Sequence, residues 1–545
     1  MTMFLKRVAA FALAALLADC TRVGTSSGGN TRHPYTRPHE FRFSSAGDIK
    51  GLNPLLGASV YEMYLASMTM AWLIKTDVHG DATVPELIKE IPSQKNGGIS
   101  GDGKTITWRL RHGVKWSDGV PFDADDVVFS TKQVSNPANN VISRDGWDQI
   151  TKIDEPDKYT VVYHLKAPYS SFATTFFSTG GANPSVLPQH LLAKYSSLNQ
   201  VPYNSLPVGI GPFKYQAWNR GDSVVMVAND SYFRGRPKLD RVSYKTVQDR
   251  NTVLEQLRTH ELDMWIPITP HYFPEAVRIP GLAASKIESF TFDHLDFNLQ
   301  NPVLRDVTVR RALRMALDRR QIIDKVQNGL YKLDESPIVP ASRFHLDLPL
   351  VPFNIARANK LLDDDGWTRG AGGVRSKNGR PLSVTLITQT GTPDTDTEIE
   401  LIRGWWRQLG VNFTVKHYLN GQYFAPAAEG GIMYGGKFDV ALFGWGIDTN
   451  EDLSNLYACY RFPPDGQNDM HWCNPAADAA MNAAKTSYDE GFRKRELDVV
   501  QRTVVGQAPT IVLDARRQLA VYNDDLKGWN PNSVSPFDDM MNVDI

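Results

Sequence analysis

Residues 105–130 read TITWRLRHGVKWSDGVPFDADDVVFS, and the apolar side chains change their period partway along this stretch. At first Ile106, Trp108 and Leu110 alternate with polar side chains, which is the pattern of a strand with one buried face. An Asp-Gly pair then indicates a turn, and Asp123 stands where an N-cap would begin a helix through the Val-Val-Phe run. The stretch therefore predicts a strand, a turn and a helix, which are the pieces of an α/β domain.

The same change of period recurs further along the chain. Residues 241–265 predict strand, helix and strand, and residues 383–418 repeat that order. Residues 305–323 predict an amphipathic helix whose many arginines form a solvated face. A chain of 545 residues exceeds one hydrophobic core, so we expect two or three domains. The 59 Lys and Arg nearly balance the 60 Asp and Glu, which gives no support for nucleic-acid binding.

The amino terminus has the features of an export signal. Two basic residues precede an apolar run at residues 8–18, which is too short to span a bilayer and is typical of a signal peptide over residues 1–19. The run ends in LLADC, so Cys20 is a candidate for lipid attachment, although Asp19 replaces the small residue expected before such a cysteine. The alternatives are an ordinary cleaved signal and a short buried helix. Residues 20–39 are polar and predict a flexible tether.

The sequence contains three cysteines, Cys20, Cys459 and Cys473. If Cys20 is lipidated or removed, export places the other two in an oxidising compartment, where a disulfide between them can persist. Two unpaired thiols, or a zinc site that adds His471, are the alternatives, but the close spacing of His471 and Cys473 is awkward for zinc. We therefore expect a Cys459–Cys473 disulfide and no metal site.

No catalytic motif stands out in the sequence. It contains neither a Gly-x-Ser-x-Gly elbow nor a His-Glu-x-x-His zinc helix. The acidic residues and histidines lack catalytic spacing, although the members of a triad need not be adjacent in sequence. We expect a protein that is not an enzyme and that carries no cofactor.

Several blocks of the chain resemble, in order, the extracellular solute-binding proteins of family 5, the peptide-, dipeptide- and nickel-binding components of ABC importers. The blocks are PELIKEIPS (85–93), residues 101–130, PVGIGPFKY (207–215), FNLQNPVLRDVTVRRALRMALDRRQII (297–323), ARANKLLDDDGW (356–367), IRGWWRQLGVNFTV (402–415) and DVALFGWGIDTNEDLSNLY (439–457). The resemblance runs from about residue 40 to the end of the sequence.

The resemblance implies an α/β, two-lobed periplasmic-binding-protein-like fold of type II, cluster C. Lobe I would be discontinuous, at residues 40–58, 206–293 and 512–545, with an extra domain inserted at residues 59–205. Lobe II would be residues 294–511. The ligand would be buried between the lobes, which would close on it by a hinge motion.

One ligand site follows from the resemblance by position. In dipeptide-binding relatives a Gly-Trp-x-x-Asp stretch supplies a carboxylate for the ligand's α-ammonium, and here the stretch contains Gly444, Trp445, Ile447 and Asp448, followed by Thr449. A buried ammonium needs a charge partner, which Asp448 would supply. The alternative is that Asp448 caps a turn or a helix.

Three more residues are candidates for ligand binding. Ser59 and Tyr61 stand at the start of an expected helix, and Thr392 lies in the loop after the expected strand at residues 383–388. Dipeptide binders hold the ligand's carboxylate with an Arg in that loop, whereas residues 389–398 read QTGTPDTDTE, with no Arg or Lys. A longer peptide, or a ligand without a carboxylate, fits this loop better.

We therefore expect an exported protein, in the periplasm or on the outer face of the cell membrane, that binds peptides and delivers them to ABC permease subunits. A protein that binds an oligosaccharide or a nickel complex is the alternative within the family, and a secreted enzyme or adhesin is the alternative outside it. We expect a monomer that contacts the membrane only through its lipid anchor and binds no nucleic acid.

Overall fold

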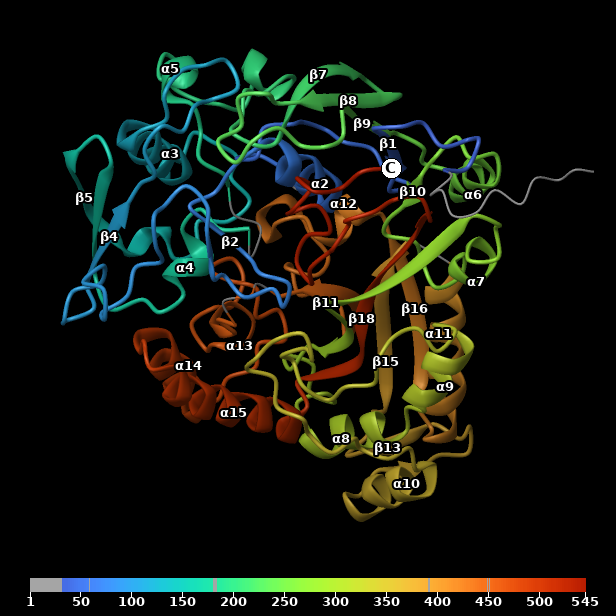
Figure 1. The fold of residues 1–545 in the computed structure, drawn as a ribbon. Helices are drawn as coiled ribbons and strands as arrows, with labels where there is room; N and C mark the ends of the chain where they lie inside the picture. Colours follow the sequence, from blue (N-terminus) through green and yellow to red (C-terminus); the bar gives the residue numbers. More distant parts are fainter. Residues whose placement is uncertain (1–31, 58, 180–183, 391–392, 448, 450) are drawn as a thin grey trace, which may run out of the picture. The chain divides into compact units, whose positions relative to one another are not determined.

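The computed structural model of the protein contains the strand and the helix expected over residues 105–130 (Figure 1). Strand β4 is Thr105–Arg109, with alternate side chains buried, and helix α3 is Ala124–Ser135. Asp123 is the N-cap of α3, and its carboxylate accepts the backbone N–H of Asp125 at 3.2 Å. The prediction from this stretch is confirmed.

The structure describes residues 32–545 except 58, 180–183, 391–392, 448 and 450. Residues 37–545 form one compact unit. The predicted signal peptide, the lipidation site Cys20 and most of the predicted tether lie outside the described residues. In the described part of the chain, every helix is too short or too polar to cross a membrane.

Strand β4 belongs to a small antiparallel sheet with a hydrophobic core of its own. The strand order is β4-β6-β5, with β5 at Ile150–Asp157 and β6 at Thr160–Leu165. The indole of Trp116 donates a hydrogen bond to Asp126 of α3 at 3.0 Å, which fixes the helix on the turn that precedes it. The same region contains β2 (Ile74–Lys75), β3 (Val84–Pro85), α4 (Phe172–Thr175) and α5 (Gln189–Leu192).

A ten-stranded mixed sheet organises the rest of the unit, in the order β16-β15-β17-β11-β18-β10-β1-β9-β8-β7. Its strands are β1 (Glu40–Ser44), β7 (Phe213–Asn219), β8 (Ser223–Ala228), β9 (Arg241–Lys245), β10 (Met264–Trp265), β11 (Leu282–Phe297), β15 (Ser383–Gln389), β16 (Asn412–Tyr418), β17 (Val440–Gly446) and β18 (Thr510–Asn523). The long strands β11 and β18 pair antiparallel from Leu282↔Asn523 to Asp296↔Thr510. They therefore run from one half of the sheet into the other.

Each half of the sheet has its own helices and its own core. Around β1 and β9 the core includes side chains of α2 (Val60–Thr69), and α6 (Arg250–Arg258) and α7 (Phe273–Ala276) pack nearby against β18. Around β15 and β17 the core includes α8 (Val307–Met315), α9 (Arg319–Lys325), α10 (Ile355–Asp364) and α11 (Pro393–Gln408), beside a separate core of α13 (Ser454–Tyr457), α14 (Pro475–Thr486) and α15 (Glu490–Gln507). The fold is therefore α/β with two lobes, as expected.

Of the arginines of α8, Arg311 is exposed as the sequence predicted, whereas Arg310 is buried and Arg314 is half-buried. Arg310 is 3% exposed and donates to the carbonyl oxygens of Gln507 and Ala508, at the end of α15. Arg311 and Arg314 donate to the carbonyls of the two preceding residues. These side chains satisfy the carbonyl groups that a helix leaves unpaired at its C-terminus.

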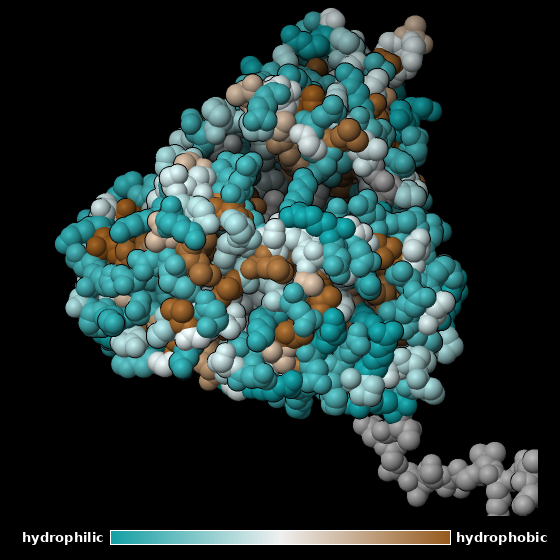
Figure 2. Space-filling view, turned by 90° about the horizontal axis from the view of Figure 1, so that it is seen from above, coloured by the Kyte–Doolittle hydropathy of each residue, from teal (hydrophilic) through white to brown (hydrophobic). Residues whose placement is uncertain are grey.

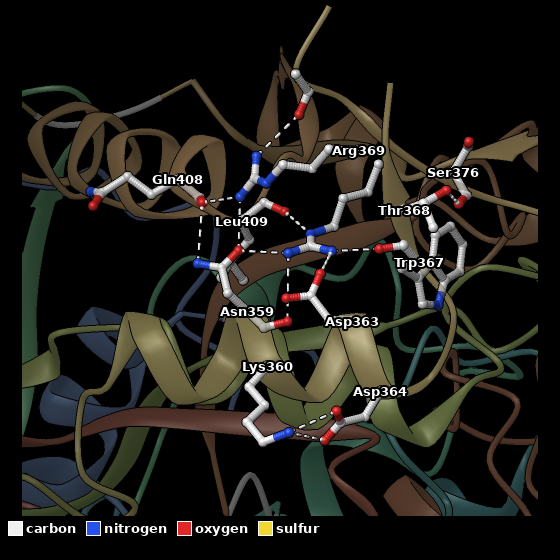
Figure 3. A network of polar contacts seen from close by, with 12 residues as sticks. Asn359, Lys360, Asp363, Asp364, Trp367, Thr368, Arg369, Ser376, Gln408 and Leu409 are labelled. Atoms are coloured by element: carbon white, nitrogen blue, oxygen red, sulfur yellow. Dashed lines mark hydrogen bonds and ion pairs between the residues drawn. The ribbon is translucent and has the colours of Figure 1, made fainter. Parts of the chain in front are cut away.

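A second buried arginine holds the outer edge of lobe II together. Asn359, Asp363, Trp367 and Leu409 lie close to one another in Figure 3, and each accepts a hydrogen bond from the guanidinium of Arg375, which is 1% exposed. Arg375 lies on β13 (Arg375–Lys377), the centre of a three-stranded ribbon with β12 (Thr368–Arg369) and β14 (Arg380–Pro381). The arginine thus ties this ribbon to α10 and to the end of α11.

Cys459 and Cys473 form a disulfide, with their Cα atoms 4.5 Å apart, as predicted. Because both sulfur atoms are in this bond, neither is a thiolate that could bind zinc. His471, the third member of the alternative zinc site, packs its ring on Phe462 instead.

Candidate functional site

Strand β17 leads into the predicted Gly-Trp stretch, and its last residues lie beside a single strand. β17 pairs with β11 from Phe297↔Val440 to Thr291↔Gly446. Its other neighbour, β15, pairs with it only at Val440 and Ala441. On the other edge, Thr388 and Tyr423 donate side-chain hydrogen bonds to the Leu442 carbonyl. Beyond Leu442, the end of β17 has one strand partner among the described residues, and an edge without a strand partner can pair with an extended chain.

Gly444 leaves room for an arginine that packs against β17, where a larger side chain would collide with it. A Cβ built on Gly444 would lie 2.6 Å from Nη2 of Arg516, on β18. The Arg516 guanidinium donates to both carboxylate oxygens of Asp293 on β11, with Nε at 2.7 Å from Oδ2. Arg516 thus links the two central strands next to the end of β17, and Asp293 already compensates its charge.

A cavity of about 790 Å³ lies at the end of β17. Trp445, Gly446 and Ile447 form one part of its wall, and the remainder comes from residues 142–148, 424–434 and 451–467. The wall therefore combines residues near the small β4 sheet with residues that follow β16 and β17. The two sides are joined by Arg461, which donates to Asp145 at 2.8 Å across 316 positions of the sequence.

The structure brings part of the predicted ligand site together at this cavity. Trp445 and Ile447 line it, Gly444 precedes them on β17, and Thr449 is buried just beyond. Asp448, which is expected to hold the ligand's ammonium, and Thr392 both lie outside the described residues.

Ser59 and Tyr61 lie at the start of α2 and are not among the residues that line this cavity. Ser59 is the N-cap of α2: its hydroxyl accepts the Glu62 N–H at 3.3 Å, and the Glu62 carboxylate accepts the Ser59 N–H at 3.0 Å. The ring of Tyr61 covers Gly47, where a Cβ would lie 2.0 Å from it. These contacts give both residues a role in the fold, and their role in ligand binding stays a prediction.

Sequence reasoning missed the segment at residues 142–148. Its Arg144 donates to the carbonyl oxygens of Val134, Asn136 and Asn139, which fixes the segment after α3. The segment has no periodic pattern or motif, so no local signal indicates that it reaches the cavity. Only the long-range contact between Asp145 and Arg461 reveals it.

Two adjacent carboxyl groups on the cavity wall have different protonation behaviour. Burial acts to raise the pKa of Asp452, but the ion pair with Lys485 at 2.6 Å brings that pKa below its ordinary value. Burial raises the pKa of Glu451 to about 7, although Ser342 donates to its carboxylate at 2.7 Å. Near neutral pH Asp452 is therefore ionised, whereas Glu451 is partly protonated.

Three further ionisable side chains are buried beneath Trp445. His294, Asp296 and Asp469 line a space of about 10 Å³, with His294 Nε2 at 3.1 Å from Asp296. Burial, reinforced by the Asp296 carboxylate, raises the pKa of Asp469 well above its ordinary value. Asp469 therefore favours its neutral form more than an exposed aspartate does.

Two lobes that share one sheet, with a large cavity at the end of a central strand, define a two-lobed α/β ligand-binding protein. The family description "bacterial extracellular solute-binding proteins, family 5 Middle" matches residues 82–466, and the chain belongs to that family.

Individual relatives extend the likeness over almost the whole chain. The oligopeptide-binding protein AppA of Bacillus subtilis (strain 168) is 24% identical over 545 residues, which cover 98% of this chain and 96% of the relative. The structure of AppA in complex with a nonapeptide superposes with a TM-score of 0.78 at 22% identity, over 92% of this chain and 98% of AppA. NikZ from Campylobacter jejuni, in complex with Ni(L-His), superposes with a TM-score of 0.77 at 24% identity, over 91% and 97%. The two-lobed type II fold implied by the sequence is thereby confirmed.

Proposed function

We propose that this chain is the extracytoplasmic binding component of an ABC importer, that it binds peptides in the cavity at the end of β17, and that it delivers them to a membrane permease. The observation that carries the proposal is the open edge of β17 at the wall of a cavity of about 790 Å³. An extended peptide can add its backbone to such an edge while its side chains occupy the cavity. A relative named for peptides, the oligopeptide-binding AppA, whose structure is in complex with a nonapeptide, supports the ligand class.

The proposal includes the roles predicted from the sequence. Asp448 pairs with the ligand's α-ammonium, while Trp445, Ile447 and Thr449 shape the site around it. Ser59, Tyr61 and Thr392 are proposed as contacts from the other side of the ligand. The assignments of Asp448, Trp445, Ile447 and Thr449 rest on the position of the Gly-Trp-x-x-Asp stretch in the sequence. Those of Ser59 and Tyr61 rest on the start of a helix, and that of Thr392 on the loop after residues 383–388.

The proposal also covers the organisation and location of the chain. Lobe I is residues 40–58, 206–293 and 512–545, the inserted domain is 59–205, and lobe II is 294–511. The mature protein is a monomer that is anchored through a lipid on Cys20, and it catalyses no reaction. Mass spectrometry of the mature amino terminus tests the anchor, because a terminus other than acylated Cys20 would contradict it.

Thermal unfolding with candidate ligands tests the ligand class. Peptides of increasing length, oligosaccharides and nickel–histidine are compared, since a ligand at about a hundred times its Kd stabilises the folded protein by about 2.7 kcal/mol. We expect stabilisation by peptides only; stabilisation by a sugar or by the nickel complex alone would replace the proposal with that alternative.

Asp448→Asn tests the ammonium site in the same assay. Loss of a charged hydrogen-bond partner should weaken an amine-bearing peptide by about tenfold to a hundredfold, whereas the N-acetylated peptide should bind both proteins equally weakly. Asp364→Asn, at an exposed site on α10, is the matched control. Unchanged affinity in Asp448→Asn would remove Asp448 from the site.

A further inference from the structure

Carboxyl groups outnumber guanidinium groups on the wall of the cavity of about 790 Å³. The wall contains five carboxyl groups and two guanidinium groups. The carboxyl groups belong to Asp145, Asp148, Glu451, Asp452 and Asp465, and the guanidinium groups to Arg144 and Arg461. Asp145, Asp148 and Asp452 already pair with Arg461, Lys166 and Lys485. Glu451 and Asp465 are therefore the carboxyl groups of this wall that favour a positively charged ligand group.

Both guanidinium groups are already engaged by the protein. Arg144 donates to three backbone carbonyls at 2.6–2.9 Å. Arg461 donates to the Asp145 carboxylate at 2.8 Å and to the backbone carbonyl of Asp465 at 3.2 Å. The Nε atom of Arg461 is buried and has no hydrogen-bond partner among the described residues, but Asp145 already compensates the charge of this side chain. An anionic ligand group would therefore compete with Asp145 and the backbone carbonyls for these two cations.

The carboxyl groups retain more capacity to accept hydrogen bonds from a ligand. Glu451 is 3% exposed, and among the described residues its second oxygen has no hydrogen-bond partner. The charges around Glu451 are Arg343 and Arg493, which stabilise its ionised form, and Asp81, which opposes it, besides the neighbouring Asp452–Lys485 pair. Asp465 is exposed at the rim of the cavity.

Aromatic rings complete the chemistry of the wall. Phe424, Tyr434 and Trp445 pack against one hydrophobic cluster of lobe II and also line the cavity. The face of an aromatic ring attracts a cation, and Trp does so most strongly. Aromatic faces beside carboxylates form a suitable environment for a long side chain that ends in a positive charge.

We infer that this cavity holds a basic side chain of the bound peptide, the ammonium of Lys or the guanidinium of Arg. The inference rests on the proposed function and adds a preference within it. Glu451 and Asp465 supply the carboxylates, and the aromatic rings contact the stem and the charged head. A glutamate side chain at the same place in the ligand meets surplus negative charge and is disfavoured.

Positional scanning of a peptide that binds tests the inference. At each position in turn Lys, Arg, norleucine and Glu are compared by isothermal titration calorimetry, with norleucine serving as an uncharged side chain of similar length. At one position we expect Lys or Arg to bind about fivefold to thirtyfold more tightly than norleucine, and Glu to bind more weakly than norleucine. This preference should shrink as salt is raised.

Variants of the cavity wall test whether the preference for a basic side chain arises there. Glu451→Gln and Asp465→Asn should each reduce the ratio of norleucine Kd to Lys Kd several-fold, with little change in the norleucine Kd itself. Because burial raises the pKa of Glu451 to about 7, the wild-type ratio should grow between about pH 6 and about pH 8, and Glu451→Gln should flatten that growth. Glu400→Gln, at an exposed site on α11, is the control and leaves the ratio unchanged.

The outcomes separate the two proposals. If peptides bind but Lys, Arg, norleucine and Glu are equivalent at every position, the inference is overturned while peptide binding stands. If Glu is the preferred residue, the charge argument is wrong in sign. If no peptide binds at all, the proposed function and the inference fail together. Asp465→Asn alters an exposed side chain, so it provides a reading even if Glu451→Gln does not fold.

Discussion

Breaking the ion pair between Asp145 and Arg461 should weaken ligand binding, because the pair bridges the cavity. The two side chains are 32% and 25% exposed, and their nitrogen and oxygen atoms are 2.8 Å apart. A fully exposed pair contributes about 0.2–1 kcal/mol and breaking a fully buried one costs about 3–5 kcal/mol, so this partly buried pair is worth about 1–1.5 kcal/mol. The hinge opening expected from the family resemblance would separate the partners, and this free energy would then favour the closed form.

Its loss should raise the Kd of a bound peptide by a factor of about 5 to 12. Asp145→Asn and Arg461→Gln are each expected to show this change, mainly as faster dissociation. Calorimetry measures the Kd, and stopped-flow tryptophan fluorescence measures the dissociation rate, since Trp445 lies on the cavity wall.

A double-mutant cycle provides the decisive comparison. If the two side chains act through each other, the double variant binds no more weakly than either single variant, and the coupling energy is about 1–1.5 kcal/mol. Additive losses would refute the reasoning, because they would mean that each side chain contacts the ligand independently. Asp240→Asn, which breaks an exposed pair with Arg236 outside the cavity, should leave the Kd unchanged.

Three further predictions concern stability. Cys459→Ser opens a loop with a sequence separation of 14 to Cys473 and should lower the free energy of unfolding in urea by about 3 kcal/mol; no change would show that the bond contributes nothing. Arg375→Met leaves several buried acceptors unpaired and should lower the free energy of unfolding by about 3–5 kcal/mol. Lys360→Ala breaks an exposed ion pair and should lower it by less than about 0.5 kcal/mol (Figure 3). Equal losses in the two variants would contradict this prediction. Burial raises the pKa of Glu398 from its ordinary 4.5 to about 8, so the folded protein binds a proton that the unfolded chain releases, and stability should fall as the pH rises between those values. Glu398→Gln should remove this part of the slope, and a slope like that of the wild type would assign it elsewhere.

Local patterns in the sequence predicted the elements well. The alternation in residues 105–109 and the cap at Asp123 both appear in the structure, because these signals depend only on neighbouring residues. The arginines of α8 show where this reasoning fails. Amphipathicity identifies which side of a helix is polar, but whether that side meets water or the end of another helix depends on packing between residues about two hundred positions apart.

The wall of the cavity was predictable only where a motif marks it. Trp445 and Ile447 were found through the Gly-Trp-x-x-Asp stretch, and both line the cavity. Residues 142–148 were missed because the chain folds them against lobe II without any periodic or compositional signal. Residues such as Asp145 therefore enter a candidate site only once the structure is known.

The arginines near the Gly-Trp stretch also bear on which end of a peptide is held. Arg516 is paired with Asp293, Arg461 is paired with Asp145, and Arg144 donates to backbone carbonyls. Residues 389–398, where dipeptide-binding relatives are expected to carry an arginine, contain no Arg or Lys. Because burying an unpaired carboxylate is costly, a dipeptide held by both termini would have to compete with these partners for an arginine. A longer peptide avoids that cost by leaving its carboxylate in water, and a cavity of about 790 Å³ with acidic and aromatic walls accommodates its side chains instead.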